Sequence, residues 1–269
     1  MTVQPPAAGE GHAEAGGQRI HYLDRGDGHP VLLIHGAFGS GANFLDNAFT
    51  RAFAPGRRVI APDSLAHGAS SAPRDPACYG ARARAGHLKA VLDRLGVERA
   101  HVVGYSMGGW MASALATFHP ERVASLAIGG WDVANGMYTP AAVWGLPEIT
   151  YEILRDMVGR ERPDLISWVT PEGEPGLAAA INAMNDLAGL AEGVARCPAP
   201  VAVWIGQDDL YHDAGRRFAE ANGLAFISLP GDHMSVLDQH GAESARRVDA
   251  FIQQAAAPGV TPAATRTGR

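Results

Sequence analysis

The feature that most constrains the fold of this chain is the alternation of short apolar runs with helical patterns. The run Val31–Ile34 is apolar throughout, as expected of a strand that is covered on both faces. Between residues 88 and 95, leucine and valine recur at helical spacing, and Gly96 follows as a natural stop. Strands that alternate with helices predict an α/β fold, with a mostly parallel central sheet and helices on both faces.

The same pattern extends along most of the chain. Strands are predicted at 18–23, 31–34, 58–61, 101–104, 123–128, 201–205 and 225–229, and helices at 88–95, 107–118, 210–222 and 242–254. Residues 132–197 carry helical patterns without a clear strand, so we expect a small helical cap inserted between two strands. The predicted domains are a flexible N-terminus (1–17), a core (18–131 and 198–255), the cap (132–197) and a disordered tail (256–269).

Composition narrows the class of protein. Hydrophobic residues make up 46% of the 269 residues and charged residues 19%, which favours a large buried core over disorder. The net charge of -6, without a basic cluster, argues against a nucleic-acid partner. We expect Cys78 and Cys197 to be ordinary thiols. The first residues do not resemble a signal peptide and no apolar run reaches roughly 18 residues, so we expect a cytoplasmic protein without a membrane partner.

The sequence Gly-Tyr-Ser-Met-Gly at 104–108 matches the pattern G-x-S-x-G. It follows the predicted strand 101–104 and opens the predicted helix 107–118, which is the context that this motif requires. The turn is so tight that side chains at the flanking glycine positions would clash and the serine is strained. Such a turn holds the Ser106 hydroxyl above the sheet, at the N-terminus of a helix that favours negative charge.

With this motif the chain resembles the α/β-hydrolase superfamily, from about residue 18 to 255, and four further segments carry the resemblance. His35–Gly39 follows a strand, as the oxyanion-hole loop of the family does. Asp63–Ser70 is similar to the pattern D-x-x-G-H-G-x-S, with Ala66 where glycine is usual. Gly206–Asp209 resembles the G-x-x-D segment that carries the acid. Gly231–His233 resembles the G-x-G-H segment that carries the base, with Asp232 in place of the usual glycine.

The resemblance implies a catalytic role for three side chains, in the chain order that this fold uses. Ser106 is the expected nucleophile, and a serine hydroxyl needs an adjacent base. His233 is that base, because imidazole titrates near neutrality, and Asp209 orients it. The oxyanion hole is expected from the backbone N–H groups of Met107 and Ala37, with Phe38 as a substitute.

Several neighbours compete for these roles. Asp208 is the rival acid, although it should point elsewhere, and His240 is the rival base, although a capping or surface position is expected at its helix start. In this family, histidines such as His35 and His67 usually order the loop backbone. A metal site built from these two histidines and Asp63 matches no known ligand spacing, so we expect neither a metal nor a cofactor.

The cap is rich in aromatic and methionine side chains, which suit an apolar, adaptable pocket. We expect a substrate pocket lined by Tyr105, Trp131, Met137, Trp144 and Met234. Cationic residues are few in the cap, which gives no case for a specific anionic substrate. The predicted function is hydrolysis of a carboxylic ester of a small to medium apolar molecule through an acyl-serine, by a monomer or homodimer.

Two alternatives stay open. Other family members use the same triad on C–C bonds or lactones, or in perhydrolysis, and fold analogy cannot separate these chemistries. Dehalogenases and epoxide hydrolases are disfavoured because they carry Asp where this chain has Ser106. The alternative from a different class is a ligand-binding sensor that keeps the triad and turns over slowly.

Overall fold

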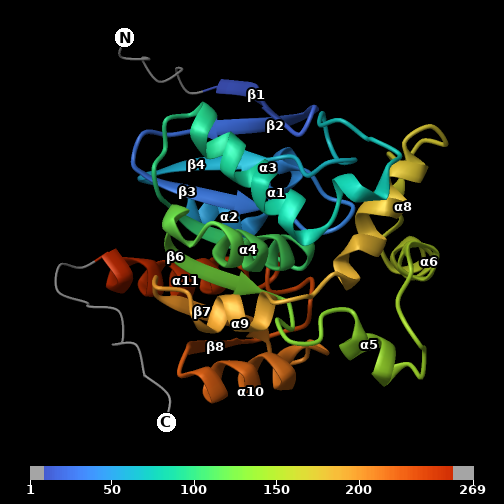
Figure 1. The fold of residues 1–269 in the computed structure, drawn as a ribbon. Helices are drawn as coiled ribbons and strands as arrows, with labels where there is room; N and C mark the ends of the chain where they lie inside the picture. The colour runs from blue at the N-terminus through green and yellow to red at the C-terminus, as the bar shows by residue number, and fades with distance from the viewer. Residues whose placement is uncertain (1–8, 257–269) are drawn as a thin grey trace.

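The computed structural model describes residues 9–256, and one eight-stranded sheet forms its centre (Figure 1). The strand order is β1-β2-β4-β3-β5-β6-β7-β8. β2 is antiparallel to both of its neighbours, and every pair from β4 across to β8 is parallel. The strands are β1 (Gly9–Ala15), β2 (Gln18–Arg25), β3 (His29–Ile34), β4 (Arg57–Pro62), β5 (Ala100–Tyr105), β6 (Val123–Gly129), β7 (Val201–Gly206) and β8 (Ala225–Leu229). The α/β fold class predicted from the sequence is confirmed.

Helices flank the sheet and fill the segment between β6 and β7 (Figure 1). The α-helices are α1 (Gly41–Leu45), α2 (Ala48–Phe53), α3 (Ala81–Arg94), α4 (Met107–Phe118), α5 (Tyr138–Val143), α6 (Tyr151–Glu161), α7 (Pro163–Ile166), α8 (Glu174–Asn182), α9 (Leu190–Ala195), α10 (His212–Asn222) and α11 (Gly241–Ala256). The part of the chain that the structure describes also has short 3₁₀ helices at η1 (Pro76–Cys78), η2 (Pro120–Arg122) and η3 (Ala183–Asn185). Across residues 9–256, none of the helices combines the length and apolar character needed to cross a membrane.

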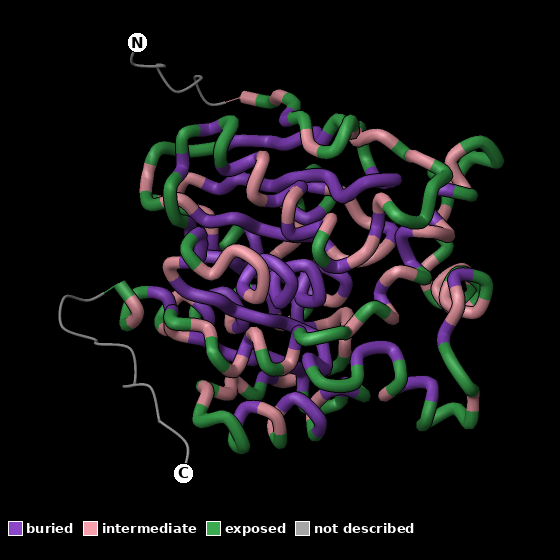
Figure 2. Tube along the Cα trace, viewed as in Figure 1, coloured by how far each residue is buried: buried purple, intermediate pink, exposed green. Residues whose placement is uncertain are grey.

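The sheet separates two apolar clusters, because side chains alternate between its faces. In β3, Leu32 and Ile34 join the cluster under α3 and α4, whereas Val31 and Leu33 join the cluster under α2 and α11. These four side chains are fully buried, which explains why the strand has no polar alternation. Figure 2 shows the same burial along the central strands.

The N-terminus corrects one prediction. Residues 9–15, expected to be flexible, form β1, which pairs with β2 along its whole length and contacts α3. Ala13 is buried by this packing, and strand pairing compensates for a sequence with weak strand propensity. Residues 1–8, and the tail predicted to be disordered from 257 onward, lie outside the described residues. Ala256 belongs to α11.

The segment between β6 and β7 is helical, as predicted, but its parts occupy two different places. Helices α5 to α8 lie at the end of the sheet where β5 and β7 terminate (Figure 1). Helix α9, included in the predicted cap, packs instead on α4 in the helical layer of the core, where Gly193 faces Thr117. We refer to residues 132–189 below as the insertion.

Candidate active site

Ser106 stands in the turn between β5 and α4, with φ 56° and ψ -120°. A non-glycine residue rarely adopts a positive φ, so this turn is strained. Glycine is required at both flanking positions, 104 and 108, because there is no room for a side chain. A Cβ on Gly104 would overlap the carbonyl oxygen of Gly108, and a Cβ on Gly108 would overlap that of Ile34. The steric reason given for the G-x-S-x-G motif is therefore confirmed.

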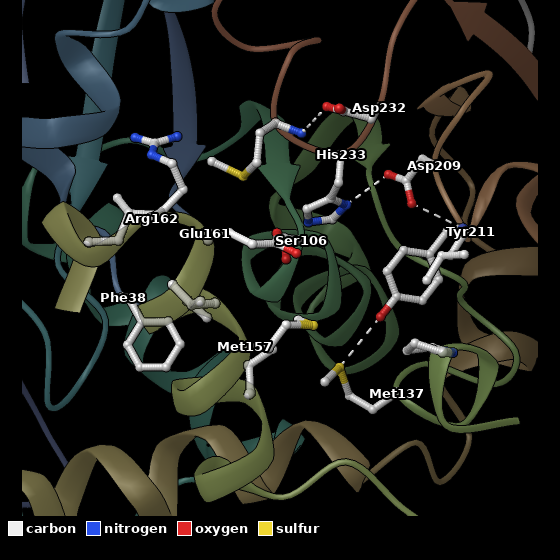
Figure 3. Close-up of a pocket in the computed structure, with 18 of the residues that line it drawn as sticks. Phe38, Ser106, Met137, Met157, Glu161, Arg162, Asp209, Tyr211, Asp232 and His233 are labelled. Atoms are coloured by element: carbon white, nitrogen blue, oxygen red, sulfur yellow. Dashed lines mark hydrogen bonds and ion pairs between the residues drawn. The ribbon is translucent and has the colours of Figure 1, made fainter. Parts of the chain in front are cut away.

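The predicted acid and base meet at the ends of β7 and β8. The carboxylate Oδ2 of Asp209 accepts a hydrogen bond from His233 Nδ1 at 2.7 Å, and its Oδ1 accepts from the Tyr211 N–H at 3.0 Å. The proton on Nδ1 leaves Nε2 free to accept another. Figure 3 shows the imidazole between Asp209 and the Ser106 side chain, at the wall of one cavity.

The charge around His233 is set by carboxylates. Burial lowers the pKa of this imidazole, but the charge and hydrogen bond of Asp209 and the charge of Asp232 together raise it above its ordinary 6.5. Asp208, the rival acid, lines the cavity without contacting His233 in the described hydrogen bonds. His240 precedes α11, and its carbonyl accepts from the Ser244 N–H at 2.9 Å, as expected of a residue at a helix start.

Two residues hold the loop of His233 in place. The Tyr105 hydroxyl donates to the backbone carbonyl of His233 at 2.6 Å. Asp232 forms a closed turn: its Oδ1 accepts from the Met234 and Ser235 N–H groups, and its own N–H donates to Ser235 Oγ. The departure from the usual glycine at 232 thus adds a structural support as well as a negative charge beside the base.

The oxyanion loop lies directly against the serine. A Cβ on Gly36 would fall 3.3 Å from Ser106 Cβ, so glycine allows this approach. Among the described residues, the N–H groups of Ala37 and Met107 donate to no other group and remain available. The Phe38 N–H instead donates to His67 Nε2 at 3.3 Å. This bond corrects the nomination of Phe38 as a substitute donor.

His35 and His67 order the loops behind the serine. His35 Nε2 accepts from the Ser64 N–H at 3.0 Å, and its Nδ1 donates to the Gly36 carbonyl at 2.7 Å. Burial lowers the pKa of His35 and holds that of His67 well below its usual value, so both imidazoles are neutral acceptors. The third residue of the metal alternative, Asp63, is already bonded to the Gly41 and Ala69 N–H groups. Within residues 9–256, no group of three ligand-type side chains could hold a metal ion.

The cavity above Ser106 has a volume of about 440 Å³ and lies between the core and the insertion. Met137, Trp144 and Met234 line it, as predicted. Tyr105 and Trp131 do not, which corrects their assignment to the pocket. Both are buried below it, Tyr105 under His233 and Trp131 against Tyr211. Lining residues that the sequence analysis did not assign to the pocket include Pro140, Leu154, Met157, Val158, Leu165, Met184, Leu210, Tyr211 and Leu237.

The charged groups on the cavity wall are mostly acidic. Besides Asp209, Glu161, Asp208 and Asp232 line it. Among the described lining residues, Arg162 is the one arginine or lysine, and its guanidinium makes two hydrogen bonds to Asp164, at 3.0 and 2.8 Å. The arginine on the described wall is therefore paired with a carboxylate, and acidic side chains outnumber it there.

Comparison with known proteins places this chain among related sequences and folds. Residues 29–211 match the family model described as alpha/beta hydrolase fold. The chain is 42% identical over 116 residues to a 2-hydroxymuconate semialdehyde hydrolase of Pseudomonas putida, covering 43% of this chain and 41% of that protein. The match thus spans less than half the length of that curated relative.

Two solved structures show the same fold over almost all of their length. A meta-cleavage product hydrolase from Pseudomonas fluorescens IP01 matches with a TM-score of 0.70 and 24% identity, covering 91% of this chain and 98% of that one. A thermophilic esterase from Thermogutta terrifontis matches with a TM-score of 0.73 and 20% identity, covering 92% and 99%. The chain therefore belongs to the α/β hydrolase fold family.

Proposed function

We propose that this protein hydrolyses carboxylic esters with a neutral, apolar acyl group through a covalent acyl-Ser106 intermediate. The observation that carries the proposal is the 2.7 Å bond from His233 to Asp209, at a cavity that also exposes the strained Ser106. A serine activated by an oriented imidazole, with N–H donors beside it, is the arrangement that acyl transfer requires.

The reaction has two stages. His233 Nε2 takes the proton of the Ser106 hydroxyl while Oγ attacks the ester carbonyl, and the N–H groups of Ala37 and Met107 stabilise the negative oxygen that forms. The imidazolium, stabilised by Asp209, then protonates the departing alcohol. Water, activated by the same imidazole, attacks the acyl-serine and releases the acid. The residues of this chain supply every proton transfer in the scheme.

The cavity supports a substrate of small to medium size. A volume of about 440 Å³ lies at the lower end of the range for small-molecule sites. Its walls are mainly methionine, leucine and aromatic side chains, which favour an apolar acyl or alcohol group. The three carboxylates of Glu161, Asp208 and Asp232 disfavour a second negative charge on the substrate.

A second candidate is cleavage of a C–C bond by the same three residues. It is favoured by the 42% identity to 2-hydroxymuconate semialdehyde hydrolase over 43% of the chain. The substrate in that name carries a carboxylate, whereas the one arginine on the described cavity wall is paired with Asp164 and three carboxylates share the wall with it. For this reason we rank ester hydrolysis first.

The test is a panel of neutral p-nitrophenyl esters of increasing acyl length, run beside 2-hydroxymuconate semialdehyde. We expect turnover of the esters, a fall in kcat on the order of 10⁴–10⁶ in Ser106→Ala, and a fall of about 10⁴ in Asp209→Asn. Asp208→Asn is the matched control, because it changes the adjacent carboxylate on the same wall, and it should retain activity. A fluorophosphonate that labels Ser106 without ester turnover would favour the sensor, and faster turnover of the semialdehyde would favour C–C cleavage.

A further inference from the structure

We infer that Trp168, in the insertion, is a positioning residue that holds the oxyanion loop in its working conformation. The inference rests on the proposed function, since it concerns how the Ala37 N–H is presented to the reacting oxygen. Trp168 Nε1–H donates to the Phe38 carbonyl at 2.9 Å. This hydrogen bond joins the insertion to the loop that follows β3.

The oxyanion loop needs such support because its turn is strained. Residues 36–39 form a turn closed by the Gly39 N–H and the Gly36 carbonyl at 3.2 Å. Phe38, the third residue of the turn, has φ 60°, in a region that favours glycine. A flip of the central peptide, which joins Ala37 and Phe38, would relieve the backbone strain at Phe38. It would also change the surroundings of Ala37, the second residue of the turn.

Phe38 is held on both sides by hydrogen bonds from different parts of the chain. Its N–H donates to His67 Nε2 at 3.3 Å, from the core, and its carbonyl accepts from Trp168 at 2.9 Å, from the insertion. The rings of His67 and Trp168 lie 5.8 Å apart, and the Phe38 ring faces Tyr151 of α6 at 6.4 Å. A flip of the Ala37–Phe38 peptide would turn the Phe38 N–H away from His67, and the bond from Trp168 fixes the next peptide of the same turn.

Trp168 is poorly explained as a core residue. It is 40% exposed, and it does not line the cavity. Its one polar atom, Nε1, donates a hydrogen bond to the backbone of a loop that lies 130 residues away in sequence. The contact therefore makes the geometry of the oxyanion hole depend on the position of the insertion.

The experiment compares two tryptophans of the insertion with the same exposure. Trp168→Phe keeps an aromatic ring and removes the donor. Trp144→Phe is the matched control: Trp144 is also 40% exposed, but it lines the cavity and makes no described bond to the oxyanion loop. Each variant is assayed for kcat and KM on a neutral p-nitrophenyl ester and for the affinity of an alkylboronic acid, whose tetrahedral adduct with Ser106 places an oxygen in the oxyanion hole. Circular dichroism and Tm verify folding.

We expect Trp168→Phe to lower kcat roughly three- to tenfold, the size of one hydrogen bond, with KM within about twofold. Boronic acid affinity should fall by a similar factor, whereas Trp144→Phe should act mainly on KM. A Trp168→Phe variant that folds and keeps kcat within about twofold of the wild type, or that changes KM alone, would overturn the inference. Failure of the proposed function is recognised separately, because the wild-type protein would then neither hydrolyse esters nor be labelled at Ser106.

Discussion

Two carboxylates act on His233, the proposed base, in different ways. Asp209 bonds the ring directly, and Asp232 adds charge while its own oxygen caps the turn that follows. Together they outweigh burial and raise the pKa of His233 above 6.5. A base must be neutral to accept a proton, so we expect activity to fall as the pH drops through this pKa.

The contribution of Asp232 can be isolated with Asp232→Asn, because an amide oxygen can still accept from the Met234 and Ser235 N–H groups. We expect the wild-type kcat/KM profile to have its acidic midpoint above pH 6.5. In Asp232→Asn the midpoint should move to lower pH, since loss of a negative charge makes the imidazolium less stable. Asp208→Asn removes a carboxylate that makes no described bond to His233, and it should move the midpoint less than Asp232→Asn does. A profile for Asp232→Asn that coincides with the wild type would refute the electrostatic role.

Three side chains of the candidate site are predictable because each stands in a short local pattern at the end of a strand. The supports of that site are not. Tyr105 reaches the carbonyl of His233 across 128 residues, and His67 reaches the Phe38 N–H across 29. Local sequence patterns do not predict contacts between loops that come together only when the sheet has folded. For this reason the prediction from the sequence wrongly places Tyr105 in the pocket lining and Phe38 among the donors of the oxyanion hole.

Among the elements, α4 most clearly shows how packing positions Ser106, the proposed nucleophile. Its first turn lies so close to β3 that a Cβ on Gly108 would fall 2.8 Å from the His35 carbonyl oxygen and overlap that of Ile34. In the proposed mechanism, this proximity aims the N-terminus of the helix and the Met107 N–H at the oxygen that becomes negative. The position of α4 against β3 therefore depends on the absence of a side chain at Gly108.

Two helix glycines allow this dependence to be measured. A Cβ on Gly86 in α3 would meet no neighbouring atom of the described residues within 4 Å, so Gly86→Ala should stabilise the protein by about 0.5–1 kcal/mol through helix propensity. Gly108→Ala has the same propensity gain but meets two backbone carbonyls, and we expect a net loss of about 1–3 kcal/mol. Urea unfolding of both variants gives the two values. Equal stabilisation of both would show that α4 can move away from β3 without cost.

The elements themselves are predicted well where apolar pattern and burial agree. The predicted bounds 225–229 and 107–118 are those of β8 and α4. The pattern misses β1 because Gly9–Ala15 has neither β-branched nor aromatic side chains, and its pairing with β2 comes from tertiary structure. Helix α9 falls in the predicted cap because an amphipathic pattern does not tell which layer its apolar face meets.

At the scale of the whole molecule, the distribution of charge supports the proposed preference for a neutral substrate. The chain carries a net charge of -6, and carboxylates outnumber cations on the described cavity wall. Like charges slow the encounter of an anionic substrate, and salt screens this repulsion.

We therefore expect kcat/KM for an ester with a carboxylate on its acyl chain to rise as salt increases from about 10 mM to 1 M, across which the Debye length shrinks from about 30 to 3 Å. A neutral ester of equal length should respond much less. The measurement is the initial rate of hydrolysis of the two esters at each salt concentration. A carboxylated ester preferred at low salt would contradict the assignment of a neutral acyl group.

The fold can be inferred from the order of strands and helices, but the reaction cannot be inferred to the same depth. Ester and C–C hydrolysis can use the same three residues, and our ranking of the two rests on the wall charges and the Arg162–Asp164 pair. Glu161 and the Arg162–Asp164 pair reach this wall only because α6 and α7 fold over the cavity, and no local pattern in the sequence encodes that packing.

Ser106, Asp209 and His233 all stand on turns that follow strands of the central sheet, and none belongs to the insertion. A lineage could therefore exchange the helices over the cavity, and with them the range of accepted molecules, without rebuilding the proton-transfer machinery beneath. The indole of Trp168 sets a condition on such exchanges. A replacement segment must bring its own donor for the Phe38 carbonyl, or the new specificity would come with a slower catalyst.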